Sequence, residues 1–391
     1  MNKQQKPRLR FKGFTGEWEC RKLGEIGSTF GGLTNKSRED FGHGDARYIT
    51  YMNVYQNALS SKHQLDSIEI DVKQNEVKKG DVLFTTSSET PEEVGMSSVW
   101  AFDINNVYLN SFCFGYRLNK QIDLNYLAYC LRSDYIRSQM ILLAQGISRY
   151  NISKKGVMEI EILIPTSEEQ TQIGNFFRRL DSQIAESCAV LEKSRQLKKA
   201  MLVKMFPTNG EKIPKIRFKG FEEEWECKKL GELCTITTGK LDANAMTENG
   251  KYDFFTSGIK KYKIDHYAFI GPAITIAGNG ATVGYMHYAD GYFNAYQRTY
   301  VLTGIQANRN FIFSEINQKL RNKIKQESRA GNIPYIVLDM LTELSIDIPT
   351  IEEQTAIGNF FRQLDETIAL QSAEVEKLNQ LKKGLLAAML V

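Results

Sequence analysis

Two long stretches of the chain carry apolar side chains at alternating steps of four and three residues, the heptad spacing of a coiled coil. The stepping positions of the first stretch, residues 164–206, include Ile173, Phe177, Leu180, Ile184 and Leu191. Those of the second stretch, residues 348–391, include Ile357, Phe361, Leu364, Ile368, Val375 and Leu378. Each stretch predicts one helix of about 40 residues, which is about 60 Å long at 1.5 Å per residue.

The starts and interruptions of these helices can also be located. Thr166 with Glu169, and Thr350 with Glu353, have the spacing of a capping box directly after a proline. Polar residues interrupt the apolar seam at Ser187, Ser194, Lys198, Gln371 and Lys382. A helix this long cannot bury its apolar stripe against a small domain, so we expect the two helices to pair with each other in an antiparallel coiled coil. The alternative is a solvated stalk that pairs with a second chain.

Both helices belong to an internal repeat. Residues 7–26 match residues 214–233 at 14 of 20 positions, and residues 164–202 match residues 348–386 at 25 of 39 positions. Between these blocks lie residues 27–163 and 234–347, which do not align with each other over most of their length. We interpret the blocks as a common frame that carries two domains of different specificity. The alternative is that buried frames resist change while exposed domains drift.

The two dissimilar inserts each mix strand-like and helical patterns. Strands are predicted at residues 48–54, 81–85, 160–164, 273–277 and 298–302, and helices at residues 124–143 and 311–327. The predicted fold class is therefore α+β, with two α/β domains held apart by the antiparallel coiled coil and related by an internal pseudo-two-fold repeat. By position along the chain, the parts are residues 1–163, 164–206, 207–347 and 348–391.

Polar, glycine-punctuated loops follow several of these predicted strands. Their side chains are of the types that read base edges or hold phosphates, with tyrosine available for stacking. The candidate DNA-binding residues are Thr85, Thr86, Ser87, Ser88, Gln145, Ser148, Arg149, Tyr150, Asn151, Asn279, Thr282, Arg298, Arg329, Asn332 and Tyr335. Ordinary surface loops are the alternative. The basic residues Lys319, Arg321, Lys323 and Lys325 could line a DNA backbone, but a solvated helix face is the simpler interpretation.

Composition narrows the class of protein without identifying it. The net charge is only +4, so charge alone does not indicate a nucleic-acid partner. No C-x-x-C pair and no clustered histidines suggest a metal site, and no apolar run of about 18 residues suggests a membrane span. The basic N-terminus is followed by no apolar stretch, so we expect a soluble, cytoplasmic protein.

Catalytic motifs are equally absent from the sequence. Residues 278–284 follow G-x-G-x-x-x-G without the lysine of a phosphate-binding loop, which predicts a turn between two strands. We find no Asn-Pro-Pro-aromatic tetrad, no nucleophile elbow and no H-E-x-x-H. These absences favour a binding protein that catalyses no reaction itself.

The repeated frame resembles the specificity subunits of type I restriction-modification systems. The resemblance rests on Arg10-Phe11-Lys12-Gly13-Phe14 with Glu17-Trp18, their copies at Arg217 and Trp225, and the twice-occurring Ile-Pro-Thr-x-Glu-Glu-Gln-Thr-x-Ile-Gly-Asn-Phe-Phe-Arg-x-Leu-Asp helices. It covers the whole chain, including the duplicated order of parts.

The resemblance implies two target-recognition domains, each reading one half of an asymmetric bipartite site in double-stranded DNA. It also implies that the helices set the spacer and dock two methyltransferase (modification) subunits, which bind S-adenosylmethionine and methylate adenine. The resemblance further implies separate motor-nuclease (restriction) subunits, which add cleavage, and no cofactor or catalytic residue in this chain. The rival hypothesis is a coiled-coil scaffold whose two variable domains bind proteins.

Overall fold

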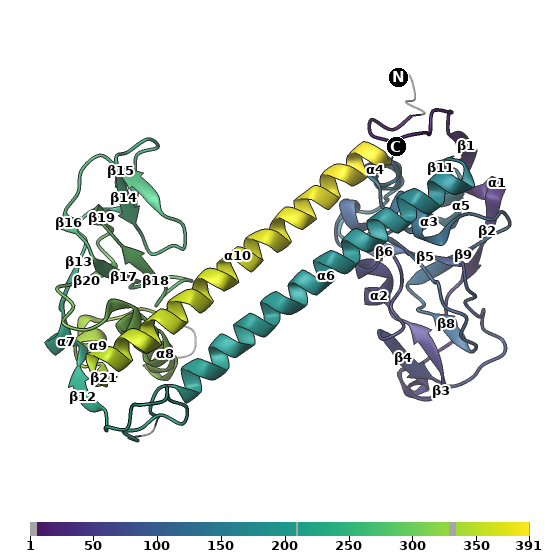
Figure 1. Ribbon diagram of the computed structural model, residues 1–391. Helices are drawn as coiled ribbons and strands as arrows, with labels where there is room; N and C mark the ends of the chain where they lie inside the picture. The colour runs from purple at the N-terminus through teal and green to yellow at the C-terminus, as the bar shows by residue number, and fades with distance from the viewer. Residues whose placement is uncertain (1–5, 209, 328–333, 391) are drawn as a thin grey trace. The chain divides into compact units, whose positions relative to one another are not determined.

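The computed structural model describes residues 6–208, 210–327 and 334–390, and the chain forms two compact units. Unit 1 comprises Met1–Ser187 with Glu374–Val391, and unit 2 comprises Cys188–Ala373. Helix α6 (Ser167–Lys204) and helix α10 (Ile351–Met389) are both uninterrupted (Figure 1) and cross from one unit into the other. Each unit therefore contains one domain with sheets, the start of one long helix and the end of the other.

Unit 1 contains two larger sheets and two short strand pairs. Its main sheet is antiparallel, in the order β2 (Gly27–Gly31), β9 (Cys113–Leu118), β5 (Val82–Thr85), β7 (Ser97–Val99). Its second sheet has the order β4 (Leu65–Ile68), β3 (Phe41–Ile49), β8 (Val107–Leu109), with β3 and β8 parallel. The short pairs are β1 (Glu19–Lys22) with β11 (Glu161–Ile164), and β6 (Ser87–Ser88) with β10 (Tyr150–Asn151).

The helices of unit 1 cover the main sheet and enclose its core. Besides the long helices they are α1 (Leu23–Ile26), α2 (Tyr51–Gln56), α3 (Leu124–Cys130), α4 (Asp134–Leu142) and α5 (Lys154–Met158), with 3-10 turns at Arg38–Asp40 and Pro91–Glu93. Phe84 and Phe114 of the sheet share this core with Phe177 at the start of α6 and Met389 at the end of α10. The start of α6 and the end of α10 thus share the core of the domain in this unit.

Unit 2 repeats the strand order of the main sheet and has one more strand in the second sheet. Its main sheet has the order β13 (Thr235–Thr238), β20 (Thr299–Thr303), β17 (Ala273–Ala277), β18 (Met286–Ala289). Its second sheet has the order β15 (Tyr262–Ile264), β14 (Tyr252–Phe255), β19 (Tyr292–Ala295), β16 (Phe269–Ile270). The remaining elements are β12 (Glu226–Lys229), α7 (Leu230–Leu233), a 3-10 turn at Ala243–Ala245, α8 (Arg309–Glu327), α9 (Leu338–Thr342) and β21 (Ser345–Ile348).

The two main sheets are therefore alike in strand order although the sequences of the domains do not align. The second sheets share three strands in the same order, and β16 is an additional edge strand of unit 2. β14 and β19 are parallel neighbours, as β3 and β8 are, and each main sheet is antiparallel throughout. The strand pair β1–β11 of unit 1 and the pair β12–β21 of unit 2 have the same register. Glu19 faces Ile164 in the first pair, and their repeat equivalents, Glu226 and Ile348, face each other in the second. The predicted α+β class, two-fold internal repeat and two long helices are confirmed.

Each unit places the end of one long helix beside the start of the other. In unit 1, Lys382 of α10 forms an ion pair with Asp181 of α6 at 2.5 Å. In unit 2, Lys198 of α6 forms an ion pair with Asp365 of α10. Lys198 and Lys382, which interrupt the heptad seam in sequence, are thus equivalent residues that each find a carboxylate on the opposing helix.

The same buried ion pair occurs in both units, where it joins the short repeated block before β1 or β12 to the start of a long helix. Arg10 donates to both oxygens of Glu169 at 2.5 and 2.7 Å, and Arg217 donates to both oxygens of Glu353 at 2.7 Å. Both carboxylates are fully buried. Only half of the predicted capping box is present, because the Thr166 hydroxyl accepts from the Glu169 amide at 3.4 Å while the Glu169 carboxylate binds Arg10 instead.

Two predicted elements are wrong. Residues 48–54 do not form one strand, because β3 ends at Ile49 and the Thr50 hydroxyl accepts from the Asn53 amide at 3.2 Å, which caps α2. Residues 124–143 do not form one helix, because α3 ends at Cys130 and the hydroxyl of the buried Ser133 accepts from the Ile136 amide, which caps α4. In both places a hydroxyl side chain starts a new helix where apolar spacing alone predicts continuity.

Candidate nucleic-acid interface

In unit 1 the structure brings together two of the predicted polar loops, which are about 60 residues apart in sequence. Strand β6 pairs with β10, so that Tyr150 faces Ser88 and Asn151 faces Ser87. The Ile152 amide also donates to the Thr86 carbonyl at 3.0 Å, and Gln145 bridges to Asn151 across its own loop. The two loops therefore form one surface at the carboxyl end of β5.

The members of this surface differ in accessibility. Thr85, Ser87 and Ser88 are buried, and the Thr85 hydroxyl accepts from the Met96 amide at 3.0 Å. Thr86 and Tyr150 are half-buried, whereas Gln145, Ser148, Arg149 and Asn151 are exposed. The buried side chains serve the fold locally, so any direct contact with a ligand falls to the exposed group.

Unit 2 contains the corresponding arrangement. Asn279, just after β17, bridges to Tyr335, and the Ile336 amide donates to the Gly278 carbonyl at 2.7 Å. These residues line an open pocket of about 210 Å³, together with Thr238, Gln297, Arg298 and Tyr300. Arg298 is exposed and has no ion-pair partner in the described part of the chain. Arg329 and Asn332 lie outside the described residues.

The two surfaces occupy equivalent places in the shared topology. β5 and β17 are each the third strand of their main sheet, and both polar segments directly follow them. The segment that follows β3 in unit 1, and the segment that follows β14 in unit 2, also reach these surfaces. Tyr51 donates to the Ser87 carbonyl at 2.7 Å, and Ser257 donates to Asn279 at 2.8 Å.

The equivalent surfaces carry different side chains. In unit 2, the half-buried Thr282 is held by a hydrogen bond to the Ser257 carbonyl, and His287 lies 3.2 Å from the Gly258 carbonyl. Burial lowers the pKa of His287, which favours its neutral form. Sequence reasoning missed the exposed Lys260 and Lys261 in this segment. Their adjacency was the available signal, but the position of Lys261 over the Phe255 ring, 5.3 Å from its centre, depends on strand pairing that sequence patterns do not show.

The basic stretch on α8 is only partly a solvated face. Lys319 donates to Asp347 at 2.6 Å and pairs with the buried Glu315 at 2.7 Å. Arg321 and Lys325 are exposed, and Lys323 is half-buried. Lys319 is therefore committed to the fold of unit 2, which leaves Arg321 and Lys325 as solvated cations.

The predicted coiled-coil residues divide into two groups. Ile173 and Phe177 lie in the core of unit 1, and Ile357 and Phe361 lie in the core of unit 2. Leu180 and Leu191 are also buried, at 6% and 7% exposure. Half-buried positions complete the set, namely Ile184, Leu364, Ile368, Val375 and Leu378. The first turns of each helix thus belong to the domain core, and the later turns carry a partly covered seam.

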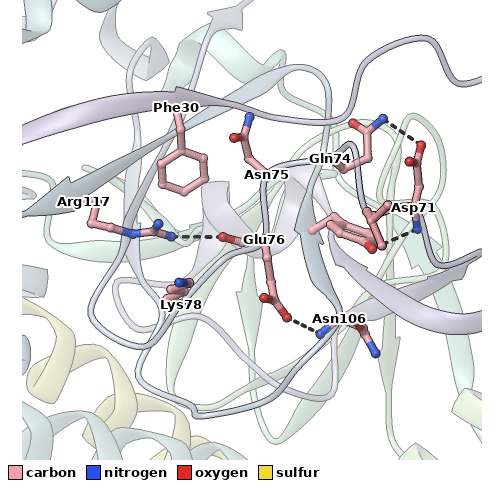
Figure 2. Close-up of a pocket in the computed structure, with 10 residues that line it drawn as sticks. Phe30, Asp71, Gln74, Asn75, Glu76, Lys78, Asn106 and Arg117 are labelled. Carbon is pink, nitrogen blue, oxygen red and sulfur yellow. Dashed lines mark hydrogen bonds between the residues drawn. The ribbon is translucent and has the colours of Figure 1, made fainter.

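A pocket of unit 1, with a volume of about 410 Å³, lies at the amino end of β5 and includes Phe30 and Arg117 (Figure 2). Arg117 donates to both oxygens of Asp81, at 2.8 and 2.6 Å, and to the Glu76 carbonyl at 3.0 Å. Its guanidinium lies 5.0 Å from the centre of the Phe30 ring. Arg117 is thus a structural cation at the end of the sheet opposite the polar loops.

Neither a metal-binding group nor a membrane-spanning helix is found among the described residues. Among residues 6–208, 210–327 and 334–390, no three or more histidine, cysteine, aspartate or glutamate side chains are grouped to hold a metal ion. Within the same ranges, no helix combines the length and apolar character that a bilayer crossing requires.

Comparison with known proteins gives one consistent family. The family model described as type I restriction modification DNA specificity domain matches residues 15–192 and 222–380. The specificity subunit of the type I restriction enzyme EcoDI from Escherichia coli is 36% identical over 167 residues, covering 43% of this chain and 37% of that protein. The MjaVIII specificity subunit from Methanocaldococcus jannaschii is 24% identical over 381 residues, covering 86% and 85%.

Solved structures agree at the level of the fold. The crystal structure of the S subunit of a type I restriction-modification system from M. genitalium superposes with a TM-score of 0.68 at 17% identity, covering 99% of both chains. A chain from a study of complex assembly and conformational transition in the type I R-M system superposes with a TM-score of 0.55 at 17% identity, covering 94% and 96%.

Proposed function

Because the chain belongs to the family of type I restriction modification DNA specificity domains, we propose that it selects the DNA sequence on which a type I restriction-modification complex acts. The predicted resemblance and the prediction of a specificity subunit rather than a catalytic one are confirmed, since the named relatives are specificity subunits. The rival hypothesis of a protein-binding scaffold is not favoured.

The observation that carries the proposal is the equivalent placement of two chemically different polar surfaces. Each surface follows the third strand of a main sheet, and each contains exposed side chains suited to base edges and phosphates. One topology with two sets of side chains suits a protein that reads two different half-sites in double-stranded DNA. The bipartite target is therefore asymmetric.

Arg149 and Arg298 are our strongest candidates for direct base reading, because both are exposed and both belong to these surfaces. Arginine most often recognises guanine through its O6 and N7 atoms, and one such contact contributes about 1–3 kcal/mol of discrimination. Asn151, Asn279 and Tyr335 are the exposed or half-buried polar neighbours that complete the two readers. Arg329 and Asn332 remain candidates from the sequence.

The remaining parts of the chain have supporting roles in this proposal. Residues 1–163 and 207–347 contain the recognition domains, and residues 164–206 and 348–391 contain the helices. The helices set the spacer between half-sites and dock two methyltransferase subunits, and restriction subunits add cleavage in a complete cytoplasmic system. The chain itself supplies no cofactor, and S-adenosylmethionine belongs to the methyltransferase subunits.

Exchanging residues 234–347 for those of another family member tests the reading of half-sites. Methylated adenines are mapped by sequencing the DNA of a host that expresses the chain with its methyltransferase subunits. We expect one half-site to change and the other to stay the same. A change in both half-sites, or in neither, would contradict independent reading by the two domains.

A substitution tests the pocket of unit 2 more sharply. Arg298→Ala should relax the target at one base pair and weaken specific binding by about 1–3 kcal/mol. Arg321→Ala removes another exposed arginine of the same unit and is the matched control. If the two variants lose affinity equally and keep the same target, Arg298 contributes charge and does not read a base.

A deletion tests the role of the helices. Removing four residues from equivalent points of α6 and α10 shortens each helix by about 6 Å. Because successive base pairs are about 3.4 Å apart, the preferred spacer should shrink by one or two base pairs. An unchanged spacer in the methylation map would exclude the helices as its ruler.

A further inference from the structure

Two arginines of unit 1 donate almost all of their hydrogen bonds to backbone carbonyls of segments that adjoin the proposed reading surface. Arg132 follows α3, and Arg137 lies in α4. Neither arginine has an ion-pair partner within the described residues, so their hydrogen bonds, rather than a carboxylate, compensate their charge. Burial lowers the pKa of both to about 10, so both remain protonated at pH 7.

Arg132 binds the carboxyl end of α2. Its Nη2 atom donates to the carbonyls of Val54 at 2.8 Å, Tyr55 at 2.9 Å and Asn57 at 3.0 Å. Its Nε atom donates to the Ser97 carbonyl at 2.7 Å. The last carbonyls of a helix have no partner within the helix, and a cation there also favours the helix dipole. Arg132 therefore fixes where this short helix ends and ties it to β7.

Arg137 binds the segment that continues from β6. Its guanidinium donates to the carbonyls of Glu92 at 2.8 Å, Val94 at 2.6 Å and Gly95 at 2.9 Å. The same segment is tied to α2, because the Glu93 carboxylate accepts from Tyr55 at 2.5 Å. Arg132 thus holds α2, and Arg137 holds the neighbouring residues 92–95, through backbone carbonyls.

Carbonyl groups are the same whatever side chain a residue carries. Hydrogen bonds from Arg132 and Arg137 therefore fix the path of α2 and of residues 92–95 without constraining which side chains these segments present. Unit 2 holds the corresponding segment differently, through side chains of the reading loops themselves, such as Thr282 to the Ser257 carbonyl. The arrangement in unit 1 separates positioning from recognition.

We propose that Arg132 and Arg137 are positioning residues that determine how well the domain of unit 1 discriminates between DNA sequences, although neither contacts DNA. The inference rests on the proposed function, since it requires that α2 and the segment after β6 adjoin bound DNA. Lysine at either position keeps the charge and the aliphatic stem, but it offers one compact ammonium group in place of the planar guanidinium that spans several carbonyls.

The test uses the full chain assembled with its methyltransferase subunits, after the target has been mapped by methylome sequencing. Affinities are compared for the mapped duplex, a duplex with the first half-site scrambled and a duplex with the second half-site scrambled. The domain exchange described above assigns each half-site to its domain. Arg132→Lys and Arg137→Lys are compared with Arg117→Lys, which alters a structural arginine of the same unit at the opposite end of the main sheet (Figure 2).

We expect both lysine variants to lose about tenfold or more of the discrimination at the half-site of unit 1, which corresponds to about 1.4 kcal/mol. Discrimination at the other half-site should not change, and Arg117→Lys should discriminate normally at both. A purely structural role would instead lower thermal stability and weaken binding to every duplex alike, leaving the ratios unchanged.

Two results would exclude the proposed function and the positioning role separately, and a third would leave the decision to one variant. If the wild-type complex does not discriminate between the duplexes, the proposed function itself fails. If the wild-type complex discriminates and both lysine variants match it within twofold, the positioning role fails. If Arg132→Lys unfolds the domain, seen as loss of hydrogen-exchange protection in β5 and β9, Arg137→Lys decides the question because it leaves α2 capped by Arg132.

Discussion

Gly174 and Gly358 occupy equivalent positions of the two long helices. When either is replaced by alanine, steric fit predicts a lower free energy of unfolding and helix propensity predicts a higher one. A β-carbon added at Gly174 would lie 2.5 Å from the Tyr126 backbone nitrogen and 2.8 Å from an Asp123 carboxylate oxygen. One added at Gly358 would lie 2.8 Å from the Phe311 backbone nitrogen. Alanine is the better helix former, by about 1 kcal/mol at an interior position. Packing alone therefore makes Gly174→Ala and Gly358→Ala unfavourable.

The magnitude follows from how far the helix would have to move. Restoring ordinary contact at Gly174 means moving from 2.5 to 3.4 Å, a shift of about 0.9 Å. Such a shift breaks the 2.9 Å hydrogen bond from the Asp123 amide to the Gln170 side chain, which contributes about 1 kcal/mol. Overpacking adds about 1–3 kcal/mol, and better helix propensity returns about 1 kcal/mol. We expect a net loss of about 1–3 kcal/mol.

Gly384→Ala is the matched control, because its added β-carbon meets nothing within 4 Å and the residue lies in the same unit as Gly174. The equivalent position of the other helix is already Ala200. Gly384→Ala should stabilise unit 1 by up to about 1 kcal/mol. Urea unfolding, with hydrogen exchange to assign each transition to a unit, measures all three variants. If Gly174→Ala and Gly384→Ala shift the midpoint in the same direction, the steric argument is refuted.

Three further substitutions test other features by the same unfolding measurements. Arg10→Ala leaves the Glu169 carboxylate buried without its partner and should cost about 3–5 kcal/mol, whereas the exposed Arg21→Ala should cost much less. Equal losses would contradict the buried-pair argument. Ser133→Ala removes the cap of α4 and should cost about 1 kcal/mol, with faster exchange at the start of that helix. Burial raises the pKa of Glu315 from 4.5 to about 7, so the folded chain holds this proton more tightly than the unfolded chain. The free energy of unfolding of unit 2 should therefore decrease as the pH rises from about 4.5 to about 7, and Glu315→Gln should remove that decrease. An unchanged pH dependence in this variant would exclude the Glu315 carboxyl as its source.

The parts of the fold that could be predicted from sequence are those governed by local periodicity. The four-and-three spacing from Ile173 onward identifies α6 and α10, and a continuous apolar run identifies β17 at the predicted residues. Local capping overrides periodicity elsewhere. Residues 48–54 look strand-like because of their tyrosines and valine, yet Thr50 starts a helix within them.

The interface depends on contacts that no local pattern encodes. The loops that contain Ser88 and Tyr150 meet only because β6 pairs with β10, and Asn279 meets Tyr335 for the same kind of reason. Ser87 and Ser88 have the composition of accessible loop residues, but that pairing buries them. The shared strand order of the two main sheets could not be predicted from the sequence either. Sequences that retain only the alternation of buried and exposed positions can keep the same strand order without aligning.

The interleaving of the two units has a consequence for how the chain folds during synthesis. Unit 2 is one continuous stretch, Cys188–Ala373, so all of its parts emerge from the ribosome in sequence. Unit 1 must wait, because its core includes Met389 and Leu390, which are made only after the whole of unit 2. Until then Ile173 and Phe177 lack the helix end that completes their core. The domain translated first is therefore the last to be finished, and a chain that stops before α10 ends would leave that apolar surface open to chaperones and proteases.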